Sequence, residues 1–201
     1  ESCALMTDAG TPAISDPGED LVRLCAENGV EVRAIPGCCA AVNALAVSGL
    51  PTGRFTFEGF LTVNKKSRRE HLNSLKGETR TMIFHEAPHK LRTTLNDLTE
   101  AFGPDRRISL CRELTKLHEE VLRFTLAEAV SYYEENAPKG EYVLVVAGAA
   151  PKTGAVVTLE DGVAQVLALK EQGMRLKDAA KEVAEHTGLS KNELYAAALE
   201  R

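Results

Sequence analysis

The sequence contains no tryptophan, and phenylalanine and tyrosine supply its whole aromatic content of 5%. It also lacks an apolar run long enough to cross a membrane, and no signal-peptide pattern opens the chain. A strong excess of charge is missing as well, because 24 basic and 29 acidic residues leave a net charge of −5, which argues against charge-driven binding of any nucleic acid. We therefore expect a cytoplasmic protein of one or two domains that does not enter the membrane.

Residue patterns typical of metal sites are absent too. The five cysteines (3, 25, 38, 39 and 111) include no CxxC pair, and most of them lie in apolar patterns typical of buried, reduced thiols. His85 and His89 are four residues apart, but Pro88 prevents a common helix, and there is no HExxH motif. No general base lies near Cys38 or Cys39, which disfavours a cysteine nucleophile. We expect no metal ion.

The stretch 7–18, with the sequence TDAGTPAISDPG, lies between an apolar run at 3–6 and a helical pattern that opens at Glu19. The run at 3–6 is typical of a buried strand, and open α/β sheets bind ligands where strands end and helices begin. Gly10 and Gly18 allow sharp turns, while two prolines stiffen the loop. Ordinary connections of this kind have about 2–6 residues. We therefore interpret this longer stretch as a ligand loop rather than a plain connection.

Residues 1–50 alternate between strand and helix patterns. A second strand is expected at 31–35, and an apolar, alanine-rich helix at 39–47, which makes a βαβα unit with a parallel sheet. Two strands cannot form a stable doubly wound domain. We therefore expect residues 1–50 to be the C-terminal part of a first α/β domain that is incomplete here. Ser48 to Gly53 is a linker pattern.

Residues 51–150 predict a second α/β domain. Two strand patterns follow each other without a helix between them, so we expect a mixed sheet. Helices are expected up to Lys76, from Pro88 to Gly103, and over 126–136. The expected strands are 55–60, 81–84, 108–111, 120–126 and 142–147.

Residues 151–201 predict a small helical segment. After a linker at 150–158, helix patterns cover 161–172 and 176–184, Gly188 stops the second, and a capping box at 190–193 opens the third. This outline is typical of a helix-turn-helix. The segment carries seven basic and eight acidic residues, so we favour docking or dimerisation over reading a nucleic-acid groove.

A basic segment contrasts with the acidic whole. Between Leu61 and Arg92 there are eight lysines and arginines against three glutamates, a local net charge of +5. Such a segment could face phosphate groups, or it could be an ordinary solvated surface, and charge alone does not separate the two.

Polar clusters fall where strands end. Besides 7–18 these are 36–40, 85–90 and 112–120, of which the last is the richest in titratable groups. That cluster directly follows an expected buried strand, which favours a functional role over a charged helix surface. Salt bridges that only support the structure are the alternative for Arg112 and Glu113.

Several exact strings carry a family resemblance. They are TDAGTPAISDPG, IPGxxA, SGLP, GFL, FHEAPHKL and RELTKLHEE, in this order. Together they resemble the small-subunit ribosomal-RNA ribose 2′-O-methyltransferases of the tetrapyrrole methylase superfamily over residues 2–200, and the two longest strings are highly specific.

The resemblance implies two α/β domains with S-adenosylmethionine between them, a small helical C-terminal domain and a homodimer. It further implies methylation of the 2′-hydroxyl of a cytidine in 16S rRNA of the small ribosomal subunit. The residues expected to bind the cofactor are Asp8, Gly10, Thr11, Ile14, Cys39, Ala40 and His85. Those expected to bind RNA are Lys65, Lys66, Arg68, Arg69 and Arg112. Glu86, Glu113 and Lys116 are the expected catalytic residues, with either carboxylate as general base and Lys116 as a phosphate anchor.

Three departures from the family pattern stand out. Cys39 replaces the usual serine and His85 the usual tyrosine, and the family's Pro-Ile-Gly-Asn cofactor loop is absent, so this chain alone is expected to bind cofactor incompletely. Two alternatives remain open at this point: a non-catalytic nucleotide- or RNA-binding module, and a methylase acting on a tetrapyrrole or a protein. The basic segment and the RELTK string favour rRNA.

Overall fold

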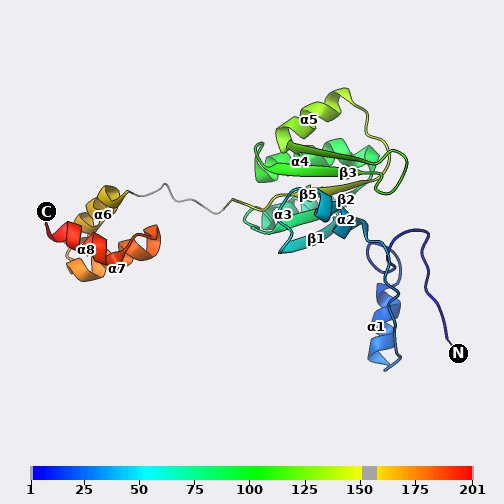
Figure 1. Ribbon diagram of the computed structural model, residues 1–201, viewed down its shortest axis with the longest axis horizontal. Helices are drawn as coiled ribbons and strands as arrows, with labels where there is room; N and C mark the ends of the chain where they lie inside the picture. Colours follow the sequence, from blue (N-terminus) through cyan, green and yellow to red (C-terminus); the bar gives the residue numbers. More distant parts are fainter. Residues whose placement is uncertain (1, 151–157, 201) are drawn as a thin grey trace. The chain divides into compact units, whose positions relative to one another are not determined.

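A computed structural model describes residues 2–150 and 158–200. By its internal contacts the chain divides into an α/β unit, residues 1–149, and a helical unit, residues 150–201 (Figure 1). The further division expected near residue 50 stays a prediction.

The α/β unit is built on one five-stranded mixed sheet, as the sequence predicts, with the order β1-β2-β5-β3-β4. β1 and β2 are parallel, whereas β5 runs antiparallel to both β2 and β3 and lies between them. β3 and β4 form the adjacent antiparallel pair that has no helix between its strands. The strands are β1 (Phe55–Phe60), β2 (Thr81–Glu86), β3 (Arg107–Arg112), β4 (Glu120–Thr125) and β5 (Tyr142–Val146).

One face of the sheet carries the larger core. Side chains alternate along a strand, so Met82 and Phe84 of β2 point to this face and are fully buried there. Leucines at helical spacing on α4 and one leucine on α3 complete the layer, together with the first turn of α5. The elements are α3 (Lys65–Ser74), the 3₁₀ turn η1 (Pro88–Lys90), α4 (Leu91–Phe102) and α5 (Leu126–Glu135).

The opposite face is covered by α2 (Ala40–Val47). Ala44 and Leu45 of this helix pack with Ile83 of β2 and with Val143 of β5 in a second core. Arg123 of β4 fastens the end of the helix, because its guanidinium donates hydrogen bonds to the carbonyls of the last helical residue and of Ser48. These carbonyls have no partner within the helix, and a cation is favourable at that end of the helix dipole.

The N-terminal segment differs from the expectation. α1 (Glu19–Glu27) forms where predicted, but neither 3–6 nor 31–35 is a strand, so those two predictions are wrong. A strand needs a neighbour to accept and donate its ladder hydrogen bonds, and neither segment has one among the described residues. Met6 and Ile35 are accordingly 83% and 84% exposed.

The helical unit consists of three helices packed around small apolar residues. They are α6 (Leu159–Glu171), α7 (Leu176–Thr187) and α8 (Lys191–Leu199), as the sequence predicts. Gly188 adopts a left-handed φ of 75° and ends α7, and the Ser190 hydroxyl accepts from the backbone N–H of Glu193 at the start of α8. The reciprocal half of that predicted capping box is not formed, whereas α6 has a complete one between Thr158 and Asp161. The linker predicted at 150–158 lies mostly outside the described residues.

None of the helices described in these two ranges is both long and apolar enough to cross a membrane.

Candidate functional site at one edge of the sheet

The strand directions bring several sequence clusters to one edge of the sheet. β1, β2 and β3 run the same way, so their last residues Phe60, Glu86 and Arg112 lie at a common edge. β5 runs the opposite way and begins there, because Tyr142 pairs with both Glu86 and Arg112. We call this the site edge. It gathers the basic start of α3, the 85–90 cluster and the 112–120 cluster, which are far apart in the sequence.

α2 directs the N-terminal loops to the same edge. Its C-terminal end is held by Arg123, which pairs with Ser109 in the first half of β3. Its middle residue Ala44 accepts a hydrogen bond from the Cys111 thiol, near the last residue of β3. The helix therefore begins near the site edge, and the turn before it, which contains Cys38, lies there too.

The loop 7–18 is fastened to that turn. The Thr11 hydroxyl donates a hydrogen bond of 3.0 Å to the carbonyl oxygen of Cys38. Gly10 has a φ of 76°, and a side chain there would begin 3.9 Å from the same oxygen. The structure thus brings Gly10 and Thr11 beside the turn that leads into Cys39 and Ala40.

The loop stores backbone strain. Ala13 and Ser15 have φ values of 68° and 60°, in the left-handed region that residues with a side chain seldom occupy. Gly18 has a φ of 136°, which side chains rarely tolerate, and an added carbon would also lie 2.5 Å from the end of the Leu5 side chain, which would have to move. Strained backbone of this kind concentrates at ligand sites. Ile14 and Asp8, the other two expected cofactor residues of this loop, are exposed.

His85 of β2 lies near enough to this loop for the charge of Asp16 to act on its imidazole. Its side chain points to the α2 face, between the rings of Phe57 and Phe60, with ring centroids 5.1 and 5.4 Å away. Burial lowers the pKa of His85, while the negative charges of Asp16 and Glu141 act in the opposite direction. The imidazole is therefore neutral near pH 7, and its buried Nε2 atom has no hydrogen-bond partner among the described residues. A buried polar atom without a partner fits a site that a ligand completes.

The side chain of Glu86, which the sequence suggests as a general base, points away from the α2 face. Adjacent residues of a strand point to opposite faces, so Glu86 points to the α4 face and is only 3% exposed. Its carboxylate accepts hydrogen bonds from the backbone N–H of Ala87 and from the hydroxyl of Thr94. We therefore correct the expectation that Glu86 is a general base, because it holds β2 to α4 instead.

Arg68 belongs to the same buried network and not to the RNA-facing surface that the sequence suggests. It is 8% exposed, and it donates to the Thr94 hydroxyl at 2.7 Å and to the Asp97 carboxylate at 2.5 Å. Lys65, Lys66 and Arg69 of the same helix are exposed. A guanidinium that is buried and paired cannot contact RNA, so the expectation for Arg68 is corrected as well.

The 112–120 cluster forms a tight loop anchored to β5. The Glu113 carboxylate accepts hydrogen bonds from the backbone N–H of Glu141 and from Lys116 Nζ, at 2.9 and 3.0 Å. Lys116 also binds the carboxylate of Glu141 at 2.8 Å. The backbone N–H of Glu141 and the Lys116 ammonium lower the pKa of Glu113, and the two carboxylates raise the pKa of Lys116. Both groups are therefore charged near neutral pH.

The backbone of this loop and the space around it restrict the conformation of Glu113. Glu113 and Thr115 have left-handed φ values of 49° and 65°, and a side chain at Gly140 would overlap Glu113, 2.5 Å from its Cγ. Arg112 sits beside it and forms an ion pair with Glu120, its cross-strand neighbour, at 3.1 Å. Arg112 and Glu113 therefore both form salt bridges within the chain, as the alternative to a functional role expected.

We expect Glu113→Gln to change substrate affinity more than turnover. An amide keeps an oxygen for the Glu141 N–H but loses the charge that holds Lys116, and a carboxylate with a lowered pKa is a weak base. In an assay of the rRNA methylation that the family resemblance implies, KM for the RNA should rise, and kcat should fall by less than about tenfold. A loss of kcat of about 10²–10⁴, as for a lost general base, would contradict this. Steady-state assays of the two constants measure the split, with Glu135→Gln, an exposed glutamate at the end of α5, as the control.

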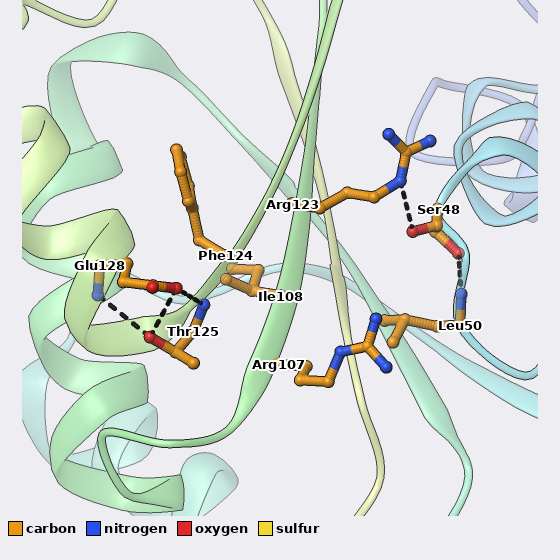
Figure 2. A pocket seen from close by; sticks show the side chains of 8 residues that line it. All are labelled: Ser48, Leu50, Arg107, Ile108, Arg123, Phe124, Thr125 and Glu128. Carbon is orange, nitrogen blue, oxygen red and sulfur yellow. Dashed lines mark hydrogen bonds between the residues drawn. The ribbon is translucent and has the colours of Figure 1, made fainter.

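A hollow of about 230 Å³ lies away from the site edge. Figure 2 shows its lining, at the end of the β3–β4 pair where Arg107 faces Thr125. Four of the polar residues there already bind within the chain: Arg123 donates to the carbonyl of Ser48, and Thr125 forms a capping box with Glu128. We assign this hollow a structural role.

Sequence reasoning missed the aromatic neighbours of His85 and the role of Glu141. Phe57 and Phe60 are three residues apart, yet they lie on one face because β1 has a bulge between Phe57 and Gly59. Glycine within a strand pattern is the signal that could have revealed it. Among residues 2–150 and 158–200 no cluster of three or more histidine, cysteine or acidic side chains could hold a metal ion.

The fold and the site define a class: an α/β protein with loops of strained backbone at the site edge, followed along the chain by a three-helix unit. The profile described as Tetrapyrrole (Corrin/Porphyrin) Methylases matches residues 1–130, and the profile described as RsmI C-terminal HTH domain matches residues 157–201. The chain belongs to the tetrapyrrole methylase family.

Curated relatives match the whole chain. A protein of Synechocystis sp. named ribosomal RNA small subunit methyltransferase I is 45% identical over 200 residues, which are 100% of this chain and 72% of that protein. The protein of the same name from Escherichia coli O157:H7 is 42% identical over 203 residues, covering 100% and 70%. A crystal structure of the methyltransferase CobJ has a TM-score of 0.54 at 23% identity and covers 70% of this chain and 62% of that one. This last likeness shows the fold.

Proposed function

We propose that this protein methylates the 2′-hydroxyl of a cytidine ribose in 16S rRNA, with S-adenosylmethionine as the methyl donor. The observation that carries the proposal is the full-length identity of 42–45% to relatives named ribosomal RNA small subunit methyltransferase I. The site edge supports it, because it places strained loops, a neutral histidine and lysines within one region.

The cofactor would lie against the loop 7–18 and the turn before α2. Gly10, Thr11 and Ile14 would contact it from the loop, with Asp8 at the loop's start, and Cys39 and Ala40 from the helix N-terminus. The unpartnered Nε2 of His85 fits a polar group at the inner wall of such a site. When bound, S-adenosylmethionine supplies an electrophilic methyl group on a sulfonium sulfur.

The residues of the chain would act mainly by positioning. Orientation of two reactants can contribute several kcal/mol to a rate. Lys116, held by Glu113 and Glu141, presents a fixed positive charge at the site edge that can bind a backbone phosphate. Arg112 offers a second cation there, and Lys65, Lys66 and Arg69 offer further ones on α3. Glu113 serves in this proposal as the anchor of Lys116.

The natural substrate in this proposal is the rRNA of the small ribosomal subunit, so the protein would act in the cytoplasm. We propose a homodimer as its working form. The near-neutral helical unit suits docking to a protein surface better than charge-driven RNA binding.

Gly10→Ala should weaken the binding of S-adenosylmethionine by about tenfold or more, because a side chain strains a φ of 76° in the loop proposed to hold the cofactor. Gly29→Ala is the matched control, since Gly29 has a φ of 67° and open space but follows α1. Isothermal titration calorimetry of the parent and both variants measures the difference. Equal losses in the two variants would contradict the assignment of this loop.

A further inference from the structure

Three rings gather on the α2 face of the sheet beside the site edge. Phe57 and Phe60 contact His85 edge-on, with interplanar angles of 73° and 74°. Large apolar side chains are normally buried, but Phe57 is 40% and Phe60 57% exposed. We call Phe57, Phe60 and His85 the aromatic platform.

The backbone of the platform is fixed by the sheet, while its rings are partly exposed on the α2 face. β1 is an edge strand, and its hydrogen bonds to β2 fix Phe60 opposite His85 and Phe57 opposite Ile83. α2 packs against β2 and β5, which leaves the rings of the neighbouring β1 partly exposed. Their surface is therefore formed in advance and needs no rearrangement to receive a flat group.

Positive charge borders the platform. After Phe60 the chain turns within four residues into α3, whose exposed Lys65, Lys66 and Arg69 lie in its first two turns. The Asn64 side chain accepts from the backbone N–H groups of Lys66 and Ser67, which fixes the start of this helix at the site edge. Exposed rings next to cations are the combination by which proteins bind single-stranded nucleic acid, the rings stacking on bases and the cations on phosphates.

We infer that the aromatic platform stacks an unpaired base of the rRNA substrate, with Phe60 as the contacting ring. The inference rests on the proposed function and names how its substrate is held. Proteins recognise single-stranded RNA by stacking unpaired bases on aromatic side chains, and an exposed ring at the site edge can receive such a base. The adjoining cations favour RNA over an uncharged apolar partner.

The test uses the whole chain, a fluorescein-labelled single-stranded RNA with the sequence around the methylated cytidine, and an abasic RNA of equal length. Phe60→Leu keeps an apolar side chain but removes the ring. Phe55→Leu is the matched control, because Phe55 is as exposed as Phe57 but lies at the start of β1, away from the site edge. Fluorescence anisotropy should show that Phe60→Leu weakens binding of the normal RNA on the order of tenfold, a typical loss for one stacked base. Binding of the abasic RNA should be unchanged.

Equal binding by Phe60→Leu and parent, or equal losses for both RNAs, would overturn the inference. A loss of S-adenosylmethionine binding without a loss of RNA binding would also overturn it, and would indicate that the platform binds the adenine ring of the cofactor. A change in the sedimenting mass would overturn it as well, and would indicate that the platform contacts a second copy of the chain. These results leave the proposed function intact if the parent methylates rRNA. A parent that neither binds nor methylates rRNA would refute the proposed function itself.

Discussion

Replacing Arg68 by methionine should lower the free energy of unfolding of the α/β unit by about 2–4 kcal/mol. Removing one member of a buried ion pair typically costs about 3–5 kcal/mol, because the partner charge stays buried alone. The carboxylate partner Asp97 keeps 33% of its side chain exposed, so part of that cost is relieved by water. The hydroxyl of Thr94 also loses a donor, and with it the link between α3 and Glu86 weakens.

The neighbouring residue Arg69 supplies the control for the Arg68 variant. Arg69→Met makes the same chemical change on the exposed side of α3, and surface substitutions of this kind usually shift stability by less than about 0.5 kcal/mol. The chain has four tyrosines, three of them in the α/β unit, so tyrosine fluorescence during urea unfolding reports mainly on that unit. Coincident unfolding midpoints for the two variants would show that the Arg68 network does not stabilise the fold.

Reversing the charges of Lys65, Lys66 and Arg69 to glutamate should abolish most of the RNA affinity at physiological salt. Each lost phosphate contact releases about 0.7 fewer counterions on single-stranded RNA, so the slope of log K against log salt should become shallower by about 2. Folding should persist, because all three side chains are exposed. Arg68 is left unchanged in this variant, since its reversal would break the buried network and confuse the result.

The matched control for this experiment is the reversal of three exposed lysines in the helical unit, Lys170, Lys177 and Lys181. If RNA binding depends on the start of α3, the control should retain the parent's salt slope. An unchanged slope in the α3 variant would contradict the proposed RNA surface. An equal loss in the control would move that surface to the helical unit.

The sequence by itself determined the local elements of this protein. The leucine spacing of 91–102, the alternation of 120–125, the stop at Gly188 and the apolar runs of 81–84 and 142–146 each predict the element that forms there. These signals are reliable because side-chain periodicity and helix ends depend on residues within a few positions of one another. Exact strings also sufficed to indicate the family, which the full-length relatives bear out.

Only the tertiary structure decided which neighbouring residue faces the site. His85 and Glu86 are adjacent in sequence, yet β2 directs the first to the α2 face of the sheet and the second into a buried network with α4, because successive side chains alternate between the faces of a sheet. The neighbouring residues Arg68 and Arg69 of α3 differ in the same way, because Arg68 binds Asp97 of α4 whereas Arg69 is exposed to solvent. The apolar runs at 3–6 and 31–35 remain unpaired, since a strand exists only where a neighbour completes its ladder. Which surface a residue meets depends on partners far along the chain, such as Asp97 for Arg68, 29 positions away, and Ser48 for Arg123, 75 positions away. Those contacts arise from packing that no local pattern encodes.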